Sequence, residues 1–238
     1  MNLILTMAGK YTRFVNEGYR IPKYILPWGD KLILSEIVNE INKKRDFLNI
    51  YLIANKRDEI YMPHVRKILR ALRIPVDNLF LISDTNGQAE TAYRGIECIK
   101  SRFHEINGPI VFHNIDTILY KRDFSDLPKI LEQYDGYIDI FKSSNHNYSY
   151  VLVKEDIVQS IAEKVVISDN ATSGLYAFSD ADSFLGLYSE EDAYISKLYE
   201  KMISRNMKIA VSALNSEKDT VVLGTPSEYL TSAYILDL

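Results

Sequence analysis

Short apolar runs alternate with segments of helical periodicity in the first half of the chain. The apolar runs, which predict buried strands, cover residues 2–7, 50–54, 79–82 and 109–112. Helices are predicted between them over residues 32–45, 57–73 and 88–100. Strands that alternate with helices form a parallel sheet, whose ligands bind at the carboxyl ends of the strands. We therefore expect the loops after the first, third and fourth strands to meet at one edge of a sheet.

The second half of the chain is richer in short strands. Strands are predicted over residues 136–141, 148–153, 172–178 and 208–213, with a further strand that runs into Glu163-Lys164. Helices are predicted near residues 193–205 and from Thr225-Pro226, where Thr caps the helix and Pro occupies its first turn. Strands in close succession favour antiparallel pairing, so a mixed sheet is expected. Because no linker, repeat or low-complexity tract interrupts the 238 residues, a single α/β domain over 1–238 is predicted.

Composition argues against several classes of protein. The formal net charge of −4 does not indicate a general nucleic-acid partner. Cys98 is the single cysteine, so an intramolecular disulfide is excluded, and no CxxC or His/Cys cluster suggests zinc. No apolar stretch approaches the length of a membrane span, and the N-terminal run lacks a basic flank. We expect a soluble cytoplasmic protein with no membrane partner.

The loop after the first strand has the composition of a phosphate site. Leu3-Ile4-Leu5 leads into Ala8-Gly9, followed by Arg13 and, after Pro22, by Lys23. Small residues past a first strand let backbone N–H groups approach a phosphate closely. Two cations beyond such a loop can neutralise phosphate oxygens. The alternative is an ordinary surface loop in which both cations are solvated.

Two later strand ends carry polar residues suited to a nucleotide. Gln88 follows Asn86-Gly87 where a strand leads into a helix, and its amide can donate to and accept from a base edge. Plain helix capping is the alternative. Asp116 ends the segment His113-Asn114-Ile115-Asp116 after the fourth strand. Mg²⁺ favours one or two carboxylates together with substrate phosphates, although an Asp at an ordinary turn would look the same. We expect His113 to be structural.

Taken together, these stretches resemble the sugar-phosphate nucleotidylyltransferases over nearly the whole chain. The first strand of that family runs into a Gly-rich loop with an Arg and then a Pro-Lys, matched here by Ala8, Gly9, Arg13, Pro22 and Lys23. Glu163-Lys164, and the stretch Ala171-Thr172-Ser173-Gly174-Leu175-Tyr176, resemble the family's acceptor-binding pair and the strand that closes its pocket. The similarity is greatest to bacterial enzymes of capsule and surface-polysaccharide synthesis. One of these activates phosphoglutamine with CTP.

The resemblance implies a fold, a reaction and a set of site residues. The implied fold is a three-layer α/β/α domain with a mixed, mostly parallel sheet, of the nucleotide-diphospho-sugar transferase (GT-A-like) type. Residues 1–116 would form its nucleotide-binding half and residues 117–238 its acceptor-binding half. The implied reaction joins an NTP, with CTP or UTP favoured, to a small phosphorylated acceptor and releases pyrophosphate. A homodimer is compatible with the resemblance.

The family's motifs assign roles to particular positions. Arg13 and Lys23 would be catalytic; Met7, Ala8, Gly9, Gln88 and Asn114 would bind the nucleotide; Glu163, Lys164 and Gly174 would bind the acceptor; Asp116 would bind Mg²⁺.

The chain departs from the family's pattern at two places. Lys10-Tyr11-Thr12 stands where the loop usually has a second Gly, and Val222 stands where many members have a second metal-binding Asp. Asp219 is an alternative metal ligand in the same turn. Two other functions therefore stay open: a glycosyltransferase of the same fold that holds a nucleotide-sugar through the Asp, and a nucleotide-binding homologue without catalysis.

Overall fold

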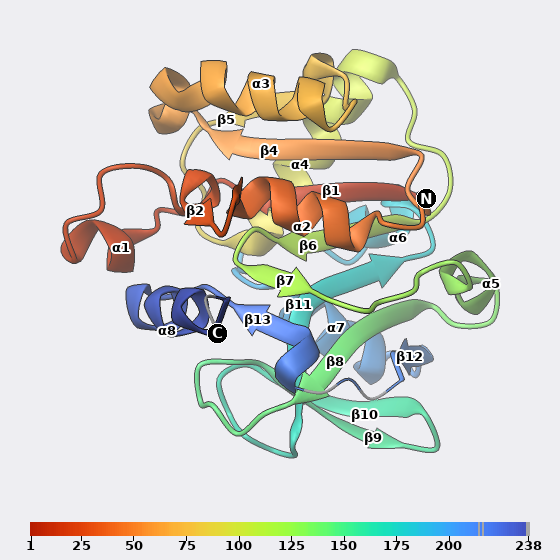
Figure 1. Cartoon of the computed structure of the whole chain (residues 1–238). Helices are drawn as coiled ribbons and strands as arrows, with labels where there is room; N and C mark the ends of the chain where they lie inside the picture. The colour runs from red at the N-terminus through yellow and green to blue at the C-terminus, as the bar shows by residue number, and fades with distance from the viewer. Residues whose placement is uncertain (214, 216, 237–238) are drawn as a thin grey trace.

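A nine-stranded sheet connects the two halves of the chain in the computed structural model, which describes residues 1–213, 215 and 217–236 (Figure 1). The strand order is β5-β4-β1-β6-β11-β8-β12-β10-β9. These strands are β1 Asn2–Met7, β4 Asn49–Asn55, β5 Leu79–Ile82, β6 Ile110–Asn114, β8 Gly136–Lys142, β9 Tyr150–Lys154, β10 Ile157–Ala162, β11 Asn170–Phe178 and β12 Ile209–Val211. Two small sheets pair β2 Pro27–Trp28 with β3 Lys31–Leu32, and β7 Thr117–Leu119 with β13 Thr220–Val222. The helices are α1 Thr12–Asn16, α2 Ile33–Ile41, α3 Met62–Ala71, α4 Gln88–Phe103, α5 Leu127–Leu131, α6 Ala181–Leu185, α7 Ile195–Ser204 and α8 Pro226–Leu236.

The first half of the sheet is parallel, as the strand–helix alternation predicts. β1 pairs in parallel with β4 and β6, and β4 pairs in parallel with β5. All six residues of β1 are buried, which is typical of a strand covered on both faces. The second half is mixed: β11 runs antiparallel to β6 and β8, whereas β12 is parallel to β8. The predicted mixed, mostly parallel sheet is therefore confirmed.

Helices cover both faces of this sheet. Successive side chains of a strand point to opposite faces, so Leu3 and Leu5 pack with residues of α2 and α3, while Ile4 packs with residues of α4 and α7. The architecture is the predicted three-layer α/β/α arrangement.

Some predicted elements are shorter or divided. The helix predicted over 57–73 is a 3₁₀ turn, Lys56–Tyr61, followed by α3, whose first turn contains Pro63. The cause is the fully buried Asp58, which turns the chain inward where a continuous amphipathic helix would keep it outside. The helix predicted over 32–45 ends at Ile41, and the strand predicted over 208–213 is limited to β12.

Elements that the sequence did not predict bring the C-terminal segment to the edge of the main sheet. β7 follows the turn at Asp116 and pairs antiparallel with β13, so that Thr117 faces Val222. The N–H of Leu223 then donates to the carbonyl oxygen of Asp116 at 2.7 Å.

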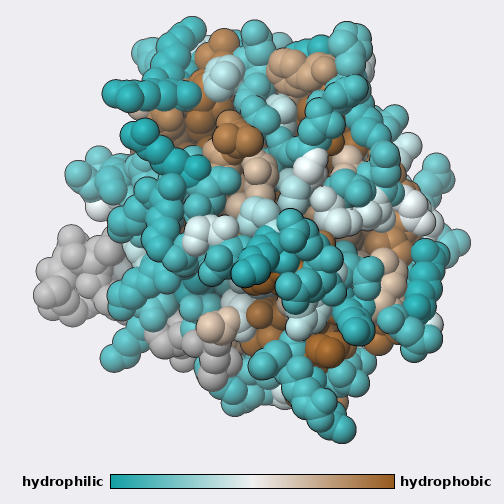
Figure 2. Space-filling view, turned by 90° about the vertical axis from the view of Figure 1, so that its right-hand side faces the viewer, coloured by the Kyte–Doolittle hydropathy of each residue, from teal (hydrophilic) through white to brown (hydrophobic). Residues whose placement is uncertain are grey.

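Within the described ranges, no helix is long and apolar enough to cross a membrane. The face shown in Figure 2 carries separate hydrophobic patches among hydrophilic side chains.

Candidate active site

A cavity of about 640 Å³ lies at the carboxyl ends of β1, β5 and β6, within the size range of small-molecule sites. The loops after these three strands line it, together with residues of β11 and the segments that flank it. All the predicted site residues except Asp219 are among its lining: Met7, Ala8, Gly9, Arg13, Lys23, Gln88, Asn114, Asp116, Glu163, Lys164 and Gly174. The structure thus brings together residues from both halves of the chain, and their individual roles stay predictions.

Arg57, which is not part of the cavity lining, holds the loop after β1 in place. One guanidinium nitrogen, Nη2, donates to the carbonyl oxygens of Ala8 at 2.8 Å and Gly9 at 3.2 Å. A trans peptide points its N–H opposite to its C=O, so the N–H groups of Gly9 and Lys10 point away from Arg57. Among the described residues, neither N–H donates to a protein acceptor. Two successive free N–H groups are suited to an anion.

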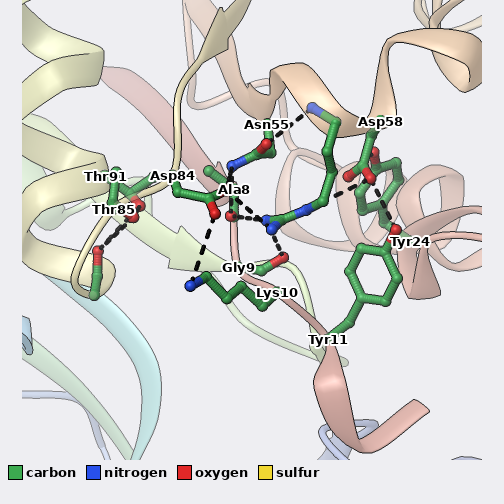
Figure 3. Close-up of polar contacts among 12 residues, drawn as sticks. Ala8, Gly9, Lys10, Tyr11, Tyr24, Asn55, Asp58, Asp84, Thr85 and Thr91 are labelled. Atoms are coloured by element: carbon green, nitrogen blue, oxygen red, sulfur yellow. Dashed lines mark hydrogen bonds and ion pairs between the residues drawn. The ribbon is translucent and has the colours of Figure 1, made fainter. Parts of the chain in front are cut away.

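Tyr11 lies in the segment Lys10-Tyr11-Thr12, which stands where the resembling family usually has a second Gly. Its backbone is left-handed, with φ 36° and ψ 37°, a region that glycine enters freely and tyrosine does not. Its hydroxyl donates to Asp58 Oδ1 at 2.8 Å, so the ring is directed toward the turn after β4. The hydroxyl of Tyr24 donates to the other oxygen of the same carboxylate at 2.9 Å (Figure 3).

Lys23 and Asp116 form an ion pair inside the cavity. Lys23 Nζ lies 2.6 Å from Asp116 Oδ2, and 16% and 24% of the two side chains are exposed. Burial alone would raise the pKa of Asp116, but the ammonium of Lys23 outweighs it and the pKa lies below its usual value. Arg13 also lowers this pKa from its position on α1. The carboxylate is therefore charged at neutral pH and faces two cations.

Gln88 is the first residue of α4 and contacts the end of β6. Its Nε2 donates to Asn114 Oδ1 in a short hydrogen bond. A Cβ on the preceding Gly87 would lie 2.1 Å from the carbonyl oxygen of Ala193, so only glycine fits at that position. The predicted place of Gln88 at a helix start is confirmed. Its predicted reading of a nucleobase stays a prediction.

Glu163 and Lys164 contact different partners on the other side of the cavity. Glu163 Oε2 accepts hydrogen bonds from the hydroxyls of Ser149 and, at 2.8 Å, Ser196. Lys164 Nζ donates to the hydroxyl of Tyr194 at 2.9 Å, which raises the pKa of the lysine. This wall offers hydroxyl groups, one carboxylate and one cation, a combination suited to a polar, anionic ligand.

The carboxylates around Asp116 bear on the predicted metal site. Asp219 lies outside the lining of the cavity, and its carboxylate pairs with Lys121 at 2.8 Å, which argues against its role as a ligand. Glu228 of α8 is instead close: a Cβ on Gly224 would lie 3.4 Å from Glu228 Oε2 and 3.6 Å from Asp116 Oδ2. Within the described residues, no group of three or more His, Cys, Asp or Glu side chains could hold a metal ion. Mg²⁺ fits Asp116 when phosphate and water oxygens supply its remaining ligands.

Sequence reasoning missed several residues of this region. A signal for Glu228 existed, because Thr225-Pro-Ser-Glu228 has the capping-box spacing, and the Thr225 hydroxyl accepts from the Glu228 N–H at 3.1 Å. Asp58 and Arg57 carried no such signal, since a predicted helix covered them. His113 is buried, and its Nε2 donates to the carbonyl oxygen of Thr117 at 2.8 Å, which agrees with the predicted structural role.

Comparison with known proteins gives partial matches in sequence and nearly complete ones in structure. No family model matches the chain. Bifunctional protein GlmU of Methanococcus aeolicus is 30% identical over 129 residues, which cover 53% of this chain and only 29% of that protein. The crystal structure of the nucleoside-diphosphate-sugar pyrophosphorylase from Vibrio cholerae RC9 is 26% identical, with a TM-score of 0.83 over 98% of this chain and 99% of the other. The inositol-1-phosphate CTP transferase from T. maritima is 13% identical, with a TM-score of 0.73 over 99% and 93% of the two chains. With the mixed sheet and its two helical layers, these matches show that the chain has the nucleotide-diphospho-sugar transferase fold.

Proposed function

We propose that this protein is a nucleotidyltransferase that joins an NTP to a small phosphorylated acceptor and releases pyrophosphate. The proposal rests mainly on the Lys23–Asp116 ion pair, which lies in the cavity that the loop after β1 also lines. Arg13 and the free N–H groups of Gly9 and Lys10 lie around the same cavity. The structurally similar protein from Vibrio cholerae is a nucleoside-diphosphate-sugar pyrophosphorylase, which supports the same reaction class.

The proposed chemistry needs positioning and charge neutralisation rather than a general base. A phosphate oxygen of the acceptor, already an anion at pH 7, attacks the α-phosphorus of the NTP in line with the departing pyrophosphate. Bound Mg²⁺ would neutralise charge on the α- and β-phosphate oxygens. Arg13 holds the pyrophosphate, and Lys164 holds the phosphate of the acceptor.

The ion pair between Lys23 and Asp116 gives each of these two side chains a partner of opposite charge before substrate binds. When the nucleotide enters, Lys23 exchanges the carboxylate for the α-phosphate and the attacking phosphate, whose mutual repulsion it offsets. Asp116, released from Lys23, would be the residue that holds Mg²⁺. Each charge has a partner both before and after binding, so neither is left unpaired in the cavity.

The identity of the substrates forms the finer part of the proposal. We propose a pyrimidine NTP, CTP or UTP, that is recognised through Gln88 and Asn114. The acceptor is a sugar 1-phosphate, or another phosphorylated metabolite such as phosphoglutamine, bound by Glu163, Lys164 and the strand around Gly174. The product would supply capsule or surface-polysaccharide synthesis in the cytoplasm. The support for these choices is the resemblance of the motifs and the hydroxyl-rich cavity wall.

One experiment separates the three classes of function. The protein is incubated with Mg²⁺, each NTP and a panel of hexose 1-phosphates, inositol 1-phosphate and phosphoglutamine, while pyrophosphate release is measured and products are identified by mass. Acceptor-dependent pyrophosphate release is expected. Transfer of a sugar from a nucleotide-sugar, without pyrophosphate, would identify a glycosyltransferase instead. Nucleotide binding with neither reaction would identify a homologue without catalysis.

A further inference from the structure

Asp58 is a buried carboxylate whose two oxygens have different phenolic partners. None of its surface is exposed, and it lies in the 3₁₀ turn after β4. Oδ1 accepts from the Tyr11 hydroxyl at 2.8 Å, and Oδ2 accepts from the Tyr24 hydroxyl at 2.9 Å. The nearest cation, Arg57 Nε, is 3.9 Å from Oδ1, too far for a hydrogen bond. A buried carboxylate needs such donors, so the position of each ring is tied to that of the carboxylate.

Each of the two tyrosines belongs to a segment that carries a cation of the cavity. Tyr11 caps α1 through its carbonyl oxygen, which accepts from the N–H groups of Phe14 and Val15, and Arg13 lies in that helix. Tyr24 directly follows Lys23 in the 3₁₀ turn Lys23–Ile25. The chain between these two segments crosses an exposed loop, whereas Asp58 connects them directly through two hydrogen bonds.

The turn that carries Asp58 also holds the backbone of the loop after β1. Arg57, the residue before it, binds the carbonyl oxygens of Ala8 and Gly9. The left-handed backbone of Tyr11 is unfavourable for a tyrosine, and the bond from its side chain to Asp58 offsets that strain. Figure 3 shows Asp58 next to the rings of Tyr11 and Tyr24, with Ala8 and Gly9 on the adjoining stretch of loop.

We propose that Asp58 is a positioning residue of the phosphate site, which holds the segments of Arg13 and Lys23 at a set separation before any substrate binds. Asp58 itself lies outside the lining of the cavity, whereas Tyr11 and Tyr24 are part of it. The proposal rests on the function proposed above, in which both cations contact phosphates. Groups that are already in place lose less freedom when the transition state forms, so their alignment affects the rate more than the stability of the fold.

The test removes one hydroxyl at a time and leaves the buried carboxylate in place. Tyr11→Phe and Tyr24→Phe are compared with Tyr120→Phe as a matched control. The Tyr120 hydroxyl donates to Glu36 Oε1 over a distance of 3.3 Å, and neither of these two residues lines the cavity. We expect Tyr11→Phe to lower kcat/KM about tenfold, with most of the change in kcat, while Tm stays within a few degrees of wild type. The control should keep its kcat/KM. Asp58→Leu removes the acceptor of both hydroxyls. A further Tyr11→Phe change in that background should be nearly neutral, because both changes remove the same bond.

Hydrogen exchange provides a readout that does not need the reaction. Without nucleotide, the hydrogen-bonded amides of Phe14, Val15, Ile25 and Leu26 should exchange several-fold faster in Tyr11→Phe and Tyr24→Phe than in the control. Unchanged exchange in both variants would overturn the proposal. Faster exchange with unchanged kcat/KM would also overturn it, since the bonds would then be merely structural. An inactive wild type whose loop exchange still depends on these hydroxyls would count against the proposed function and not against the connection through Asp58.

Discussion

Two side chains of opposite charge, Lys23 and Asp116, are in direct contact inside the cavity. The Lys23–Asp116 pair joins residues 93 positions apart, and the lowered pKa of Asp116 keeps its carboxylate ionised at neutral pH. With both side chains partly exposed, water and ligands can reach them. An ion pair of this kind is suited to exchange partners with an anionic substrate, so the contribution of each member can be measured separately.

Lys23→Ala should abolish most turnover without unfolding the protein. A charge-assisted contact made mainly in the transition state contributes about 3 kcal/mol or more, roughly a hundredfold in rate. Pyrophosphate release gives kcat, and circular dichroism checks the fold. Lys44→Ala is the control, because Lys44 pairs with Asp123 on the surface. A Lys23→Ala enzyme with near-normal kcat would remove this lysine from the mechanism.

The proposed Mg²⁺ requirement can be tested at two carboxylates. Asp116→Asn should abolish Mg²⁺-dependent activity, because this carboxylate lines the cavity. Asp219→Asn should leave most of it, because Asp219 pairs with Lys121 outside that lining. Activity is titrated with Mg²⁺ in each variant, and Mn²⁺ binding is measured with and without NTP. Equal losses in both variants would show that Asp219 is also a ligand, and full activity in EDTA would dismiss the metal.

Gln88→Ala tests the reading of the nucleobase. If the amide contacts the base edge, its loss should weaken NTP binding or blur selectivity by about 1–3 kcal/mol, the usual effect of leaving a buried polar partner unsatisfied. KM is compared for the four NTPs, with Gln159→Ala as the control, because Gln159 is the exposed residue of β10. An unchanged KM and unchanged selectivity would reduce Gln88 to a helix-start residue.

The strand β11 changes its pairing where it passes the cavity. Its register with β8 shifts between Thr172 and Tyr176, and Gly174 in this interval has φ +84°. A Cβ at Gly174 would lie 2.4 Å from Asn114 Nδ2, and Asn114 in turn bonds Gln88. The irregular strand therefore sets how closely Gly174 approaches Asn114 and, through it, Gln88.

Gly174→Ala and Gly108→Ala separate backbone strain from crowding. Both glycines have left-handed backbones, φ +84° and +79°, but no atom lies within 4 Å of a Cβ at Gly108. Each variant should lose about 1–2 kcal/mol of stability in urea unfolding from the strained backbone. Gly174→Ala alone should also impair catalysis, since it displaces Asn114. Full activity of Gly174→Ala would show that this contact does not matter for turnover.

A buried ion pair attaches the small β7–β13 sheet to the main sheet. Arg122, after β7, binds Asp139 of β8 at 3.1 Å and the Thr220 hydroxyl of β13 at 2.6 Å. Only 3% of the Arg122 side chain and 0% of the Asp139 side chain is exposed. The β7–β13 sheet, which places Gly224 beside Asp116, is thereby attached to the centre of the main sheet.

Arg122→Ala should be among the most destabilising changes in the chain. It leaves the Asp139 carboxylate buried without its cation, which typically costs about 3–5 kcal/mol. Urea unfolding measures the free energy. The double variant Arg122→Met/Asp139→Leu should recover much of the loss, because it removes both charges. If Arg122→Ala unfolds with the wild-type midpoint, the pair contributes nothing to stability.

Local patterns in the chain were sufficient to predict the main sheet and much of the lining of the cavity. β1 and β5 lie at the predicted residues, because strands buried on both faces must be continuously apolar. The cavity forms from the predicted loops, since parallel strands bring their carboxyl ends to one edge. Gly9, Arg13 and Gln88 could be found from these positions alone.

Contacts between distant segments decided the rest. The burial of Asp58 depends on two tyrosines that lie 34 and 47 residues away in the sequence. The local periodicity contains no sign of them, so it predicted one continuous helix over this segment. Glu228 reaches the neighbourhood of Asp116 only because β13 pairs with β7, two three-residue strands too short to give a clear pattern. Asp219, close to Val222 in sequence, is carried outside the cavity lining by the same pairing. The sequence alone shows which charged and polar side chains the protein has. Which partner each charge has was decided by the tertiary structure, because it depends on which strands pair.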